Sequence, residues 1–353
     1  MQADENERVG FTCAYTPVAL IDAAGLVPFR VLPVGDAPDR AGSLLHDNMC
    51  PHIKRVLDRV LAGDVPDLAG VVLMDSCDAM RRLADAWGAA RPAERVVFLD
   101  LPVNCDDRSV AYFRKELDRL VGQLCEWSGR QVTADVVTRS VERYNDLASR
   151  LALLAERAAD GALPGGRKAL QEILDRSVTQ PVAESLAELK RIDDEPDVPQ
   201  DTDARTPVFL FGNVLPGPEP FELLEACGCR VVGDDVCTGS RQLVPMTIKG
   251  TEDVMTQLAR AVLSRPPCAR TVDASQPGQL AEQVRARAKA CGAKGVVAHV
   301  MKFCDPYLAR LPAVRESLQE AGLPLLVLEG DCTLRSLGQQ RTRVEAFVEM
   351  LGG

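Results

Sequence analysis

The alternation of apolar runs with amphipathic segments predicts an α/β protein built from two copies of one unit. Gly70–Ala79 reads GVVLMDSCDA and Gly295–Pro306 reads GVVAHVMKFCDP. Each stretch is a β-branched run of strand length that contains a Cys-Asp pair and leads into a helical pattern. A second apolar strand follows each copy, RVVFLDLP at 95–102 and PLLVLEGD at 324–331. This repetition favours two similar domains.

The first unit opens with a predicted strand at Val9–Cys13, a helix at Thr16–Ala24 and a strand at 29–34. Apolar residues at helical spacing after Cys50 predict an amphipathic helix, and Gly63 is placed to end it. The first copy of the repeated strand follows this helix.

Long amphipathic helices follow Cys105. The pattern predicts a first helix that ends at Gly129, a second at about 133–158 and a third at about 166–189. Because the second half has no counterpart to them, we expect a helical appendage at about 108–190. It either packs on the sheet or forms a dimer surface.

The acidic, proline-containing stretch DDEPDVPQDTDART at 193–206 is the best candidate for a linker. It divides the chain into an N-terminal α/β domain at 1–192, which carries the appendage, and a C-terminal α/β domain at 207–353. The second domain begins with strands VFLFG and RVVGDD around a helix, and GQQRTRVEAFVEML closes it as an amphipathic helix. Strands that alternate with helices predict parallel sheets, whose ligands gather at the carboxyl ends of the strands.

Composition narrows the function classes. The chain has 353 residues, 46% of them hydrophobic and 26% charged, which suits two globular domains. The net charge of -10 argues against a nucleic-acid-binding surface. The N-terminal sequence MQADENERVG lacks an apolar targeting segment and no apolar run is long enough to span a membrane, so we expect a cytoplasmic protein.

The twelve cysteines carry the candidate chemistry. In a reducing compartment, cysteines in this number indicate metal binding or redox chemistry rather than disulfides. Cys77 and Cys304 occupy matched places in the repeat, and each is followed after 28 positions by another cysteine at a strand end, Cys105 and Cys332.

Several cysteines also stand just before a predicted helix. Cys50 precedes Pro51, Cys304 precedes Asp305-Pro306, which is a cap-like pair, and Cys13 precedes Thr16-Pro17. A helix N-terminus offers unpaired N–H groups and partial positive charge, which favour a thiolate. A single cysteine is more simply explained as a small buried hydrophobe, but matched cysteines in two repeats are not.

Iron–sulfur chemistry is a better match to these cysteines than zinc. The sequence has no CxxC pair, only Cys227-Gly228-Cys229 at a helix end. His46 and His52 flank Cys50, and His299 lies in a predicted strand as a core residue. Iron–sulfur clusters have no obligatory ligand spacing when the cysteines come from separate loops. The remaining cysteines are predicted bystanders: Cys125, Cys227, Cys229, Cys268 and Cys291.

The motifs YTPVALIDAAG, CPHIKRVLDRVLAG, SCDAMRRL, FLDLPVN, GDDVCTGSR, MKFCDP and GQQRTRVEAF lie in this order along nearly the whole chain. Together they resemble the 2-hydroxyacyl-CoA dehydratase and benzoyl-CoA reductase superfamily. The resemblance implies two Rossmann-like domains with a four-iron four-sulfur cluster in the interdomain cleft. Its ligands would be the matching residues Cys50, Cys77 and Cys304.

The chain has more cysteines than one such cluster uses, and it is similar to the double-cubane cluster branch of this superfamily. In that interpretation Cys13, Cys105 and Cys332 hold a second, bridged cubane. Cys237 is the reserve candidate in place of Cys13, because the GDDVCTGSR motif also resembles single-cluster relatives.

The resemblance implies reduction at low potential, which requires electrons driven by ATP. The chain has no GxxxxGK[ST] motif, and GALPGGRK at 161–168 lacks the spacing. We therefore expect a separate iron–sulfur activator ATPase as partner. Three functions stay open: a homodimeric double-cubane reductase of small molecules, a subunit of a heterodimeric 2-hydroxyacyl-CoA dehydratase or benzoyl-CoA reductase with one cluster, and a non-catalytic electron carrier.

Overall fold

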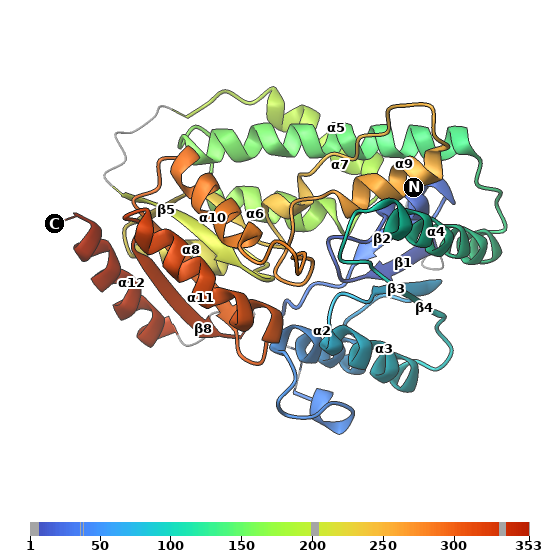
Figure 1. The fold of residues 1–353 in the computed structure, drawn as a ribbon, viewed down its shortest axis with the longest axis horizontal. Helices are drawn as coiled ribbons and strands as arrows, with labels where there is room; N and C mark the ends of the chain where they lie inside the picture. Colours follow the sequence, from blue (N-terminus) through green and yellow to red (C-terminus); the bar gives the residue numbers. More distant parts are fainter. Residues whose placement is uncertain (1–6, 36, 38, 199–204, 332–336, 353) are drawn as a thin grey trace.

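The protein contains two four-stranded parallel sheets with helices on both faces (Figure 1). The structure, a computed structural model, describes residues 7–35, 37, 39–198, 205–331 and 337–352. The first sheet consists of β1 (Arg8–Phe11), β2 (Val27–Arg30), β3 (Gly70–Met74) and β4 (Val96–Leu99). The second consists of β5 (Thr206–Gly212), β6 (Cys229–Asp235), β7 (Gly295–Met301) and β8 (Leu325–Gly330).

Both sheets have the same strand order, β2-β1-β3-β4 and β6-β5-β7-β8. The two repeated sequence stretches form β3 and β7, which are the third strand of their respective units. The predicted duplication, the α/β class and the parallel sheets are therefore confirmed.

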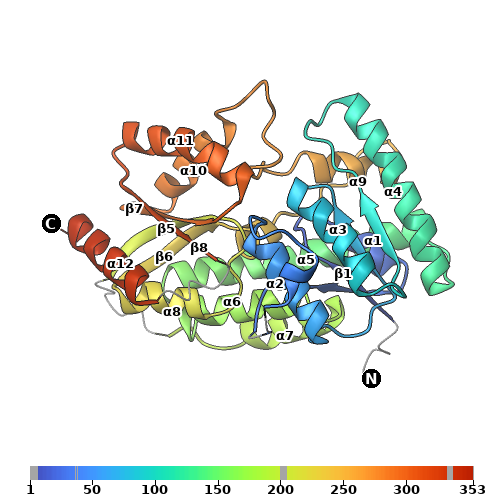
Figure 2. The same cartoon turned by 90° about the horizontal axis from the view of Figure 1, so that it is seen from below.

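Twelve helices are described. They are α1 (Val18–Ala23), α2 (Pro51–Ala62), α3 (Asp78–Ala90), α4 (Asp107–Ser128), α5 (Ala134–Ala159), α6 (Gly166–Ser177), α7 (Val182–Asp193), α8 (Glu219–Ala226), α9 (Val254–Leu263), α10 (Gln279–Ala290), α11 (Asp305–Glu320) and α12 (Leu337–Gly352). In the second unit, α10 and α11 cover one face of the sheet, and α8 and α12 cover the other (Figure 2). In the first unit α2 and α3 form one layer, and α1, α4 and α5 form the opposite layer.

Local sequence explains where the long helices begin and end. The Asp106 carboxylate accepts a hydrogen bond from Ser109 N at 2.7 Å at the start of α4, and Gly129 ends that helix in the left-handed conformation. The Thr133 side chain caps α5 in the same way, and Gly63 ends α2. These predicted boundaries are confirmed.

Several predicted elements differ from the structure. The strand expected at Val9–Cys13 is β1 at Arg8–Phe11, and the helix expected at Thr16–Ala24 is α1 at Val18–Ala23, whose N-cap is Pro17 and not Thr16. The strand expected at 29–34 is β2 at Val27–Arg30, because it pairs in register with β1, which is only four residues long. The helix expected at 166–189 is two helices, α6 and α7. Pro181 stands at the N-cap of α7, where its missing N–H interrupts no helical hydrogen bond.

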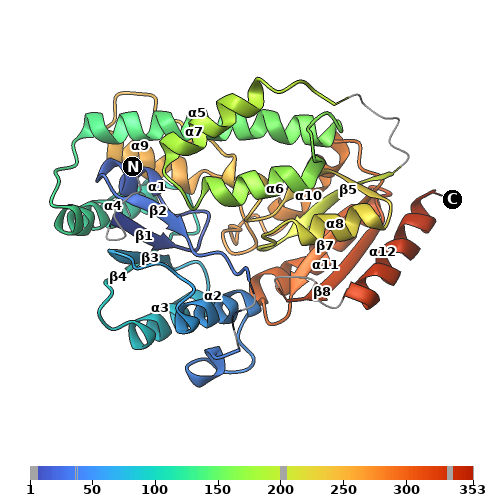
Figure 3. The ribbon, with the colours of Figure 1, turned by 180° about the vertical axis from the view of Figure 1, so that it is seen from behind.

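The helical appendage joins the two halves of the chain. The helix α5 runs along both units in Figures 1 and 3, and it contacts α1 of the first unit and β6 of the second. In the opposite direction, α9 comes from the second half but packs its Leu258 and Val262 into the core that contains Phe113 of α4. The hydrophobic cores therefore cross the predicted linker. The dimer surface and the domain boundaries remain predictions.

A buried ion pair fixes the appendage to the second sheet. Arg167 of α6 pairs with Asp234 of β6, and both side chains are buried. Burial disfavours the charged carboxylate, but Arg167 and Arg287 hold the pKa of Asp234 below its ordinary value. The pair is therefore charged at neutral pH and inaccessible to solvent.

We expect Arg167→Ala to lower the free energy of unfolding by about 3–5 kcal/mol, because it leaves Asp234 buried without its partner. The matched control is Lys168→Ala, which breaks the half-exposed pair with Glu222 and is expected to cost about 0–1 kcal/mol. Urea denaturation of the two variants measures the difference. Equal losses would contradict a special role for the buried pair.

Candidate metal centre between the two sheets

The carboxyl ends of strands from both sheets meet at one cavity of about 100 Å³. In each sheet the strand order reverses at the first strand, so β1 and β3, like β5 and β7, flank a topological switch point. Such points are where parallel sheets bind ligands. The turns after these four strands carry Cys13, Cys77, Asn213 and Cys304, and all four residues line the cavity.

Six cysteines line this cavity, and all six are free thiols. They come from both halves of the chain and are half-buried or buried. We refer to the cavity as the thiol cavity. Its cysteines are Cys13, Cys50, Cys77, Cys237, Cys268 and Cys304.

Three of these cysteines occupy the N-cap position of a helix: Cys50 at α2, Cys77 at α3 and Cys304 at α11. None of the three helices has a side-chain cap hydrogen bond. The prediction that these cysteines stand at helix starts is confirmed, with one correction. The cap of α11 is Cys304 itself, because Asp305 already has helical geometry and Pro306 lies in the first turn.

Four of the six thiols are placed so that they keep their protons in the absence of a cation. Burial raises the pKa of Cys13, raises that of Cys77 to about 11 and raises that of Cys237 to about 12. A hydrogen bond with Cys50 and burial raise the pKa of Cys304 well above the ordinary range. Thiolate ligands at these positions would therefore need the positive charge of a metal.

The cavity wall also carries buried donors that lack a partner in the described structure. These are Arg270 Nη1 and Tyr307 Oη. Burial raises the pKa of Tyr307 well above its ordinary value, so its hydroxyl remains a donor. Such donors fit an acceptor-rich anionic group in the cavity, since a buried donor without an acceptor is costly.

The charges of Arg30 and Arg270, which both line the cavity, strengthen this fit. Among the described residues the Arg30 side chain donates to the backbone carbonyls Thr12 O at 3.3 Å and Cys237 O at 2.9 Å, and Arg270 donates to Asp75 O and Leu101 O. Neither forms an ion pair with a carboxylate in the described part of the chain. A group held by thiolates would supply the missing negative charge.

Within the described residues, no three His, Cys, Asp or Glu side chains lie close enough together to hold a metal ion. The six thiols are distributed around the cavity wall. Of the histidines, His52 lines the cavity, and burial lowers its pKa to about 3 so that it is neutral. His299 is buried in β7 and contacts Asp331 O through Nε2 at 2.8 Å, which fits the core position expected for it.

The structure brings together most, but not all, of the cysteines predicted as ligands. Cys13, Cys50, Cys77 and Cys304 line the cavity, and so does the reserve candidate Cys237. Cys105 does not line it; its thiol packs against the first core and approaches Arg260 O at 3.7 Å. Cys332 lies outside the described residues.

Sequence reasoning missed Cys268, which it had treated as a bystander. The residue follows no strand, so the strand-end pattern could not find it. Its loop is held by hydrogen bonds from Cys268 N to Thr271 Oγ1 at 2.9 Å and from Tyr15 Oη to Pro266 O at 2.9 Å. The only sequence signal is the rigid Pro266-Pro267 pair in front of it.

The residue before Cys304 is conformationally unusual. Phe303 has a φ of 57°, the one positive value among the described non-glycine residues, and its ring is exposed. A bulky residue in this conformation indicates local strain, which often occurs at functional sites. Asn213, in the turn after the neighbouring strand β5, donates from Nδ2 to Cys304 Sγ at 2.8 Å.

The fold and the cavity define a class: duplicated α/β proteins whose two parallel sheets share one thiol-lined site. The chain belongs to the family described as 2-hydroxyglutaryl-CoA dehydratase, D-component, whose family model matches residues 13–351. The superfamily predicted from the sequence motifs is thereby confirmed.

Characterised relatives are similar over almost their whole length. The chain is 23% identical to the (R)-phenyllactyl-CoA dehydratase beta subunit of Clostridium sporogenes, covering 99% of this chain and 93% of that protein. It is 24% identical to the lactoyl-CoA dehydratase subunit beta of Anaerotignum propionicum, covering 97% and 91%. It is 26% identical to one of the benzoyl-CoA reductase subunits of Thauera aromatica, covering 92% and 86%. The relatives are thus dehydratase and reductase subunits.

Across the described helices, none combines the length and apolar character that a bilayer crossing requires.

Proposed function

We propose that this chain is the iron–sulfur component of a low-potential reductase and carries a double-cubane cluster in the thiol cavity. The observation that supports this proposal is that six free cysteines from both halves of the chain line one cavity. One cubane with an open iron site needs three of them, and a second bridged cubane accounts for the other three.

The first cubane is assigned to Cys50, Cys77 and Cys304. Each stands at the N-cap of a helix of at least twelve residues, where unpaired N–H groups and the helix dipole stabilise a thiolate. Such a cluster supplies one-electron reduction. The residues of this chain would hold it, bury it and donate hydrogen bonds to its sulfur atoms, which tunes its potential.

For the second cubane the geometry favours Cys13, Cys237 and Cys268, which line the same cavity. The thiols of this set act on one another electrostatically, because a charge on Cys268 or Cys13 disfavours ionisation of Cys237. The set based on sequence spacing, with Cys105 and Cys332, remains the alternative. The experiments below separate the two.

A second candidate function is a subunit of a heterodimeric 2-hydroxyacyl-CoA dehydratase or benzoyl-CoA reductase with one cluster. The observation that favours it is that the relatives are themselves named as subunits of such enzymes. Anaerobic iron and sulfide analysis distinguishes the two functions, with about eight irons per chain expected for the double cubane and about four for the single cluster. The double-cubane function implies a homodimer, whereas the single-cluster function implies a partner subunit of a different type.

We expect Cys77→Ser and Cys304→Ser each to remove most of the iron, because both thiols stand at equivalent positions of the repeat on opposite walls of the cavity. Iron content and the reduced spectrum of anaerobically purified protein measure this loss. The matched control is Cys125→Ser, which changes a cysteine on α4 outside the cavity. Full iron content in either cavity variant would disprove the cluster site.

The pair Cys268→Ser and Cys105→Ser tests the second cubane. Cys268→Ser is expected to lower iron towards half and leave the spectrum of a single cubane, whereas Cys105→Ser keeps the iron and costs about 1 kcal/mol of stability. Loss of iron in Cys105→Ser but not in Cys268→Ser would instead support the ligand set that contains Cys105 and Cys332. If neither variant loses iron, the double cubane is wrong and the single-cluster subunit is favoured.

We also propose that electrons come from a separate ATP-hydrolysing iron–sulfur activator. The glycine-rich stretch at 161–168 begins just after α5 and continues into the first residues of α6, so it follows a helix and not the strand that a phosphate-binding loop requires. We expect the isolated chain to lack ATPase activity and to be reduced only when ATP and the activator are both present. Steady ATP hydrolysis by the purified chain alone would contradict this division of labour.

A further inference from the structure

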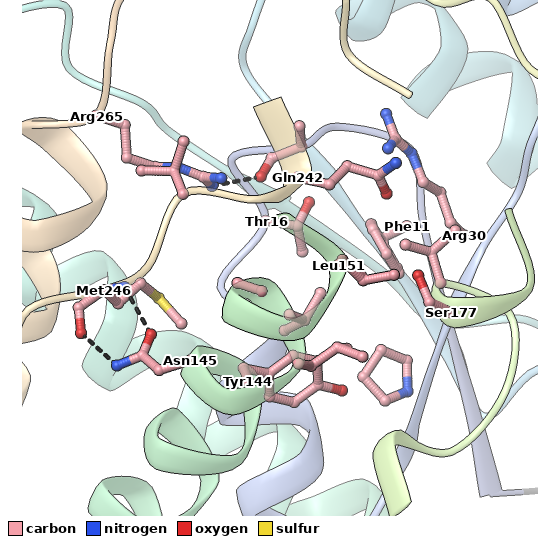
Figure 4. Close-up of a pocket in the computed structure, with 17 residues that line it drawn as sticks. Phe11, Thr16, Arg30, Tyr144, Asn145, Leu151, Ser177, Gln242, Met246 and Arg265 are labelled. Carbon is pink, nitrogen blue, oxygen red and sulfur yellow. Dashed lines mark hydrogen bonds between the residues drawn. The ribbon is translucent and has the colours of Figure 1, made fainter. Parts of the chain in front are cut away.

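A second cavity lies next to the thiol cavity, and the proposed cluster does not use it. It measures about 90 Å³ and is enclosed by the ends of β1 and β2, the start of α1, the middle of α5 and the loop at 242–246 (Figure 4). The two cavities share Ala14 and Arg30 in their walls. We call this space the α5 cavity.

Most of its wall is apolar. Side chains from the first sheet, from α1, from α5 and from the loop at 242–246 form this part of the lining. They include Phe11, Val18, Leu147, Ala148, Leu151 and Met246. An apolar group of a ligand would therefore be stabilised by burial against this wall.

Two buried donors in the wall have no partner in the described structure. They are Thr16 Oγ1, on a side chain that is 4% exposed, and Arg30 Nη2, on a side chain that is 1% exposed. Gln242 Oε1 is also unpartnered and adds an acceptor that a water or a ligand hydroxyl would satisfy. In Figure 4, Arg30 and Gln242 lie towards one end of the cavity, and Tyr144 and Asn145 lie towards the other.

The cavity has an excess of positive charge. Arg30 and Arg265 both line it, and neither forms an ion pair with a carboxylate in the described parts of the chain. Arg265 donates to Ala14 O and Arg241 O, both at 2.6 Å. The negative charge of Asp175 favours the charged form of Arg30 without a direct contact. The Asp175 carboxylate oxygens instead accept from Gly217 N at 2.7 Å and Gln171 Nε2 at 2.9 Å.

We propose that the α5 cavity binds a small monocarboxylate with an apolar body, whose carboxylate accepts hydrogen bonds from Thr16 Oγ1 and Arg30 Nη2. A carboxylate satisfies both unpartnered donors, and the apolar body lies against α5. A volume of about 90 Å³ admits a short-chain acid and excludes a long-chain one. The Arg30 side chain, which lines both cavities, lies between this ligand and the thiol cavity.

Titration calorimetry of the anaerobically purified chain with n-alkanoates tests the proposal. Butyrate, with six non-hydrogen atoms, is expected to bind, whereas butyramide, which lacks the charge, binds at least about tenfold more weakly. Decanoate is too large and is expected not to bind. Equal binding of inorganic phosphate and butyrate would overturn the role of the apolar wall, and no binding of any alkanoate would overturn the site.

Thr16→Val is the sharpest variant, because the hydroxyl that it removes has no partner without ligand. The ligand-free variant is expected to be as stable as the parent, and butyrate is expected to bind about 10- to 100-fold more weakly. Thr16→Ser keeps the hydroxyl and restores binding. Unchanged butyrate affinity in Thr16→Val would overturn the proposed contact.

A second pair of variants tests the apolar wall. Ala148→Leu fills the cavity from α5 and is expected to abolish butyrate binding, while Leu153→Ala changes an exposed residue of the same helix and leaves binding intact. The readout does not depend on the cluster, so Cys77→Ser protein is expected to bind butyrate as well. Loss of binding in Leu153→Ala, or its persistence in Ala148→Leu, contradicts the location.

Discussion

The centre of this protein depends on the electrostatic complementarity of thiols and arginines that line one buried cavity. Burial holds Cys13, Cys77 and Cys237 in the protonated form, while Arg30 and Arg270 carry positive charge into the same cavity without a carboxylate beside them in the described structure. The arginines lack a negative charge beside them, and the thiols lack a cation that would ionise them. Metal ions would ionise the thiols, and the resulting anionic cluster would be stabilised by the arginines and by the helix N-termini.

Such a site requires that the two sheets keep a fixed distance, because each half supplies only part of the wall. Three features hold them. The helix α5 packs on α1 and β6, α9 returns from the second half to the core of the first, and the loop around Cys268 is tied to the first half through Tyr15 and through Arg270, which donates to Asp75 O at 3.0 Å. The appendage is thus part of the site's framework, and the hydrophobic cores cross the predicted linker for the same reason.

The sequence predicted the duplication, the parallel sheets and the cysteines at the ends of β1, β3, β6 and β7, because hydrophobic periodicity and strand-end position are local properties. It could not predict which strand ends meet. The cavity lies at the ends of β2, β1 and β3 in the first sheet, whereas β4 is the edge strand beyond β3, and Cys105 in the loop after it does not line the cavity. Cys268 and Arg30 enter the cavity through tertiary contacts that leave no periodic signal.

The two halves have diverged where they meet. Cys77 and Cys304 keep the same place in the repeat, but the turn after the first strand carries Cys13 in one half and Asn213 in the other. The second turn starts at Gly212, where an added Cβ would lie 2.2 Å from His299 O, so only glycine allows β5 to pass so close to β7. The Asn213 side chain donates from Nδ2 to Cys304 Sγ, and the Asn213 backbone carbonyl accepts from Cys237 N at 2.7 Å. The second half thus has at this turn an asparagine that contacts two of the cysteine residues of the cavity, where the first half supplies a thiol.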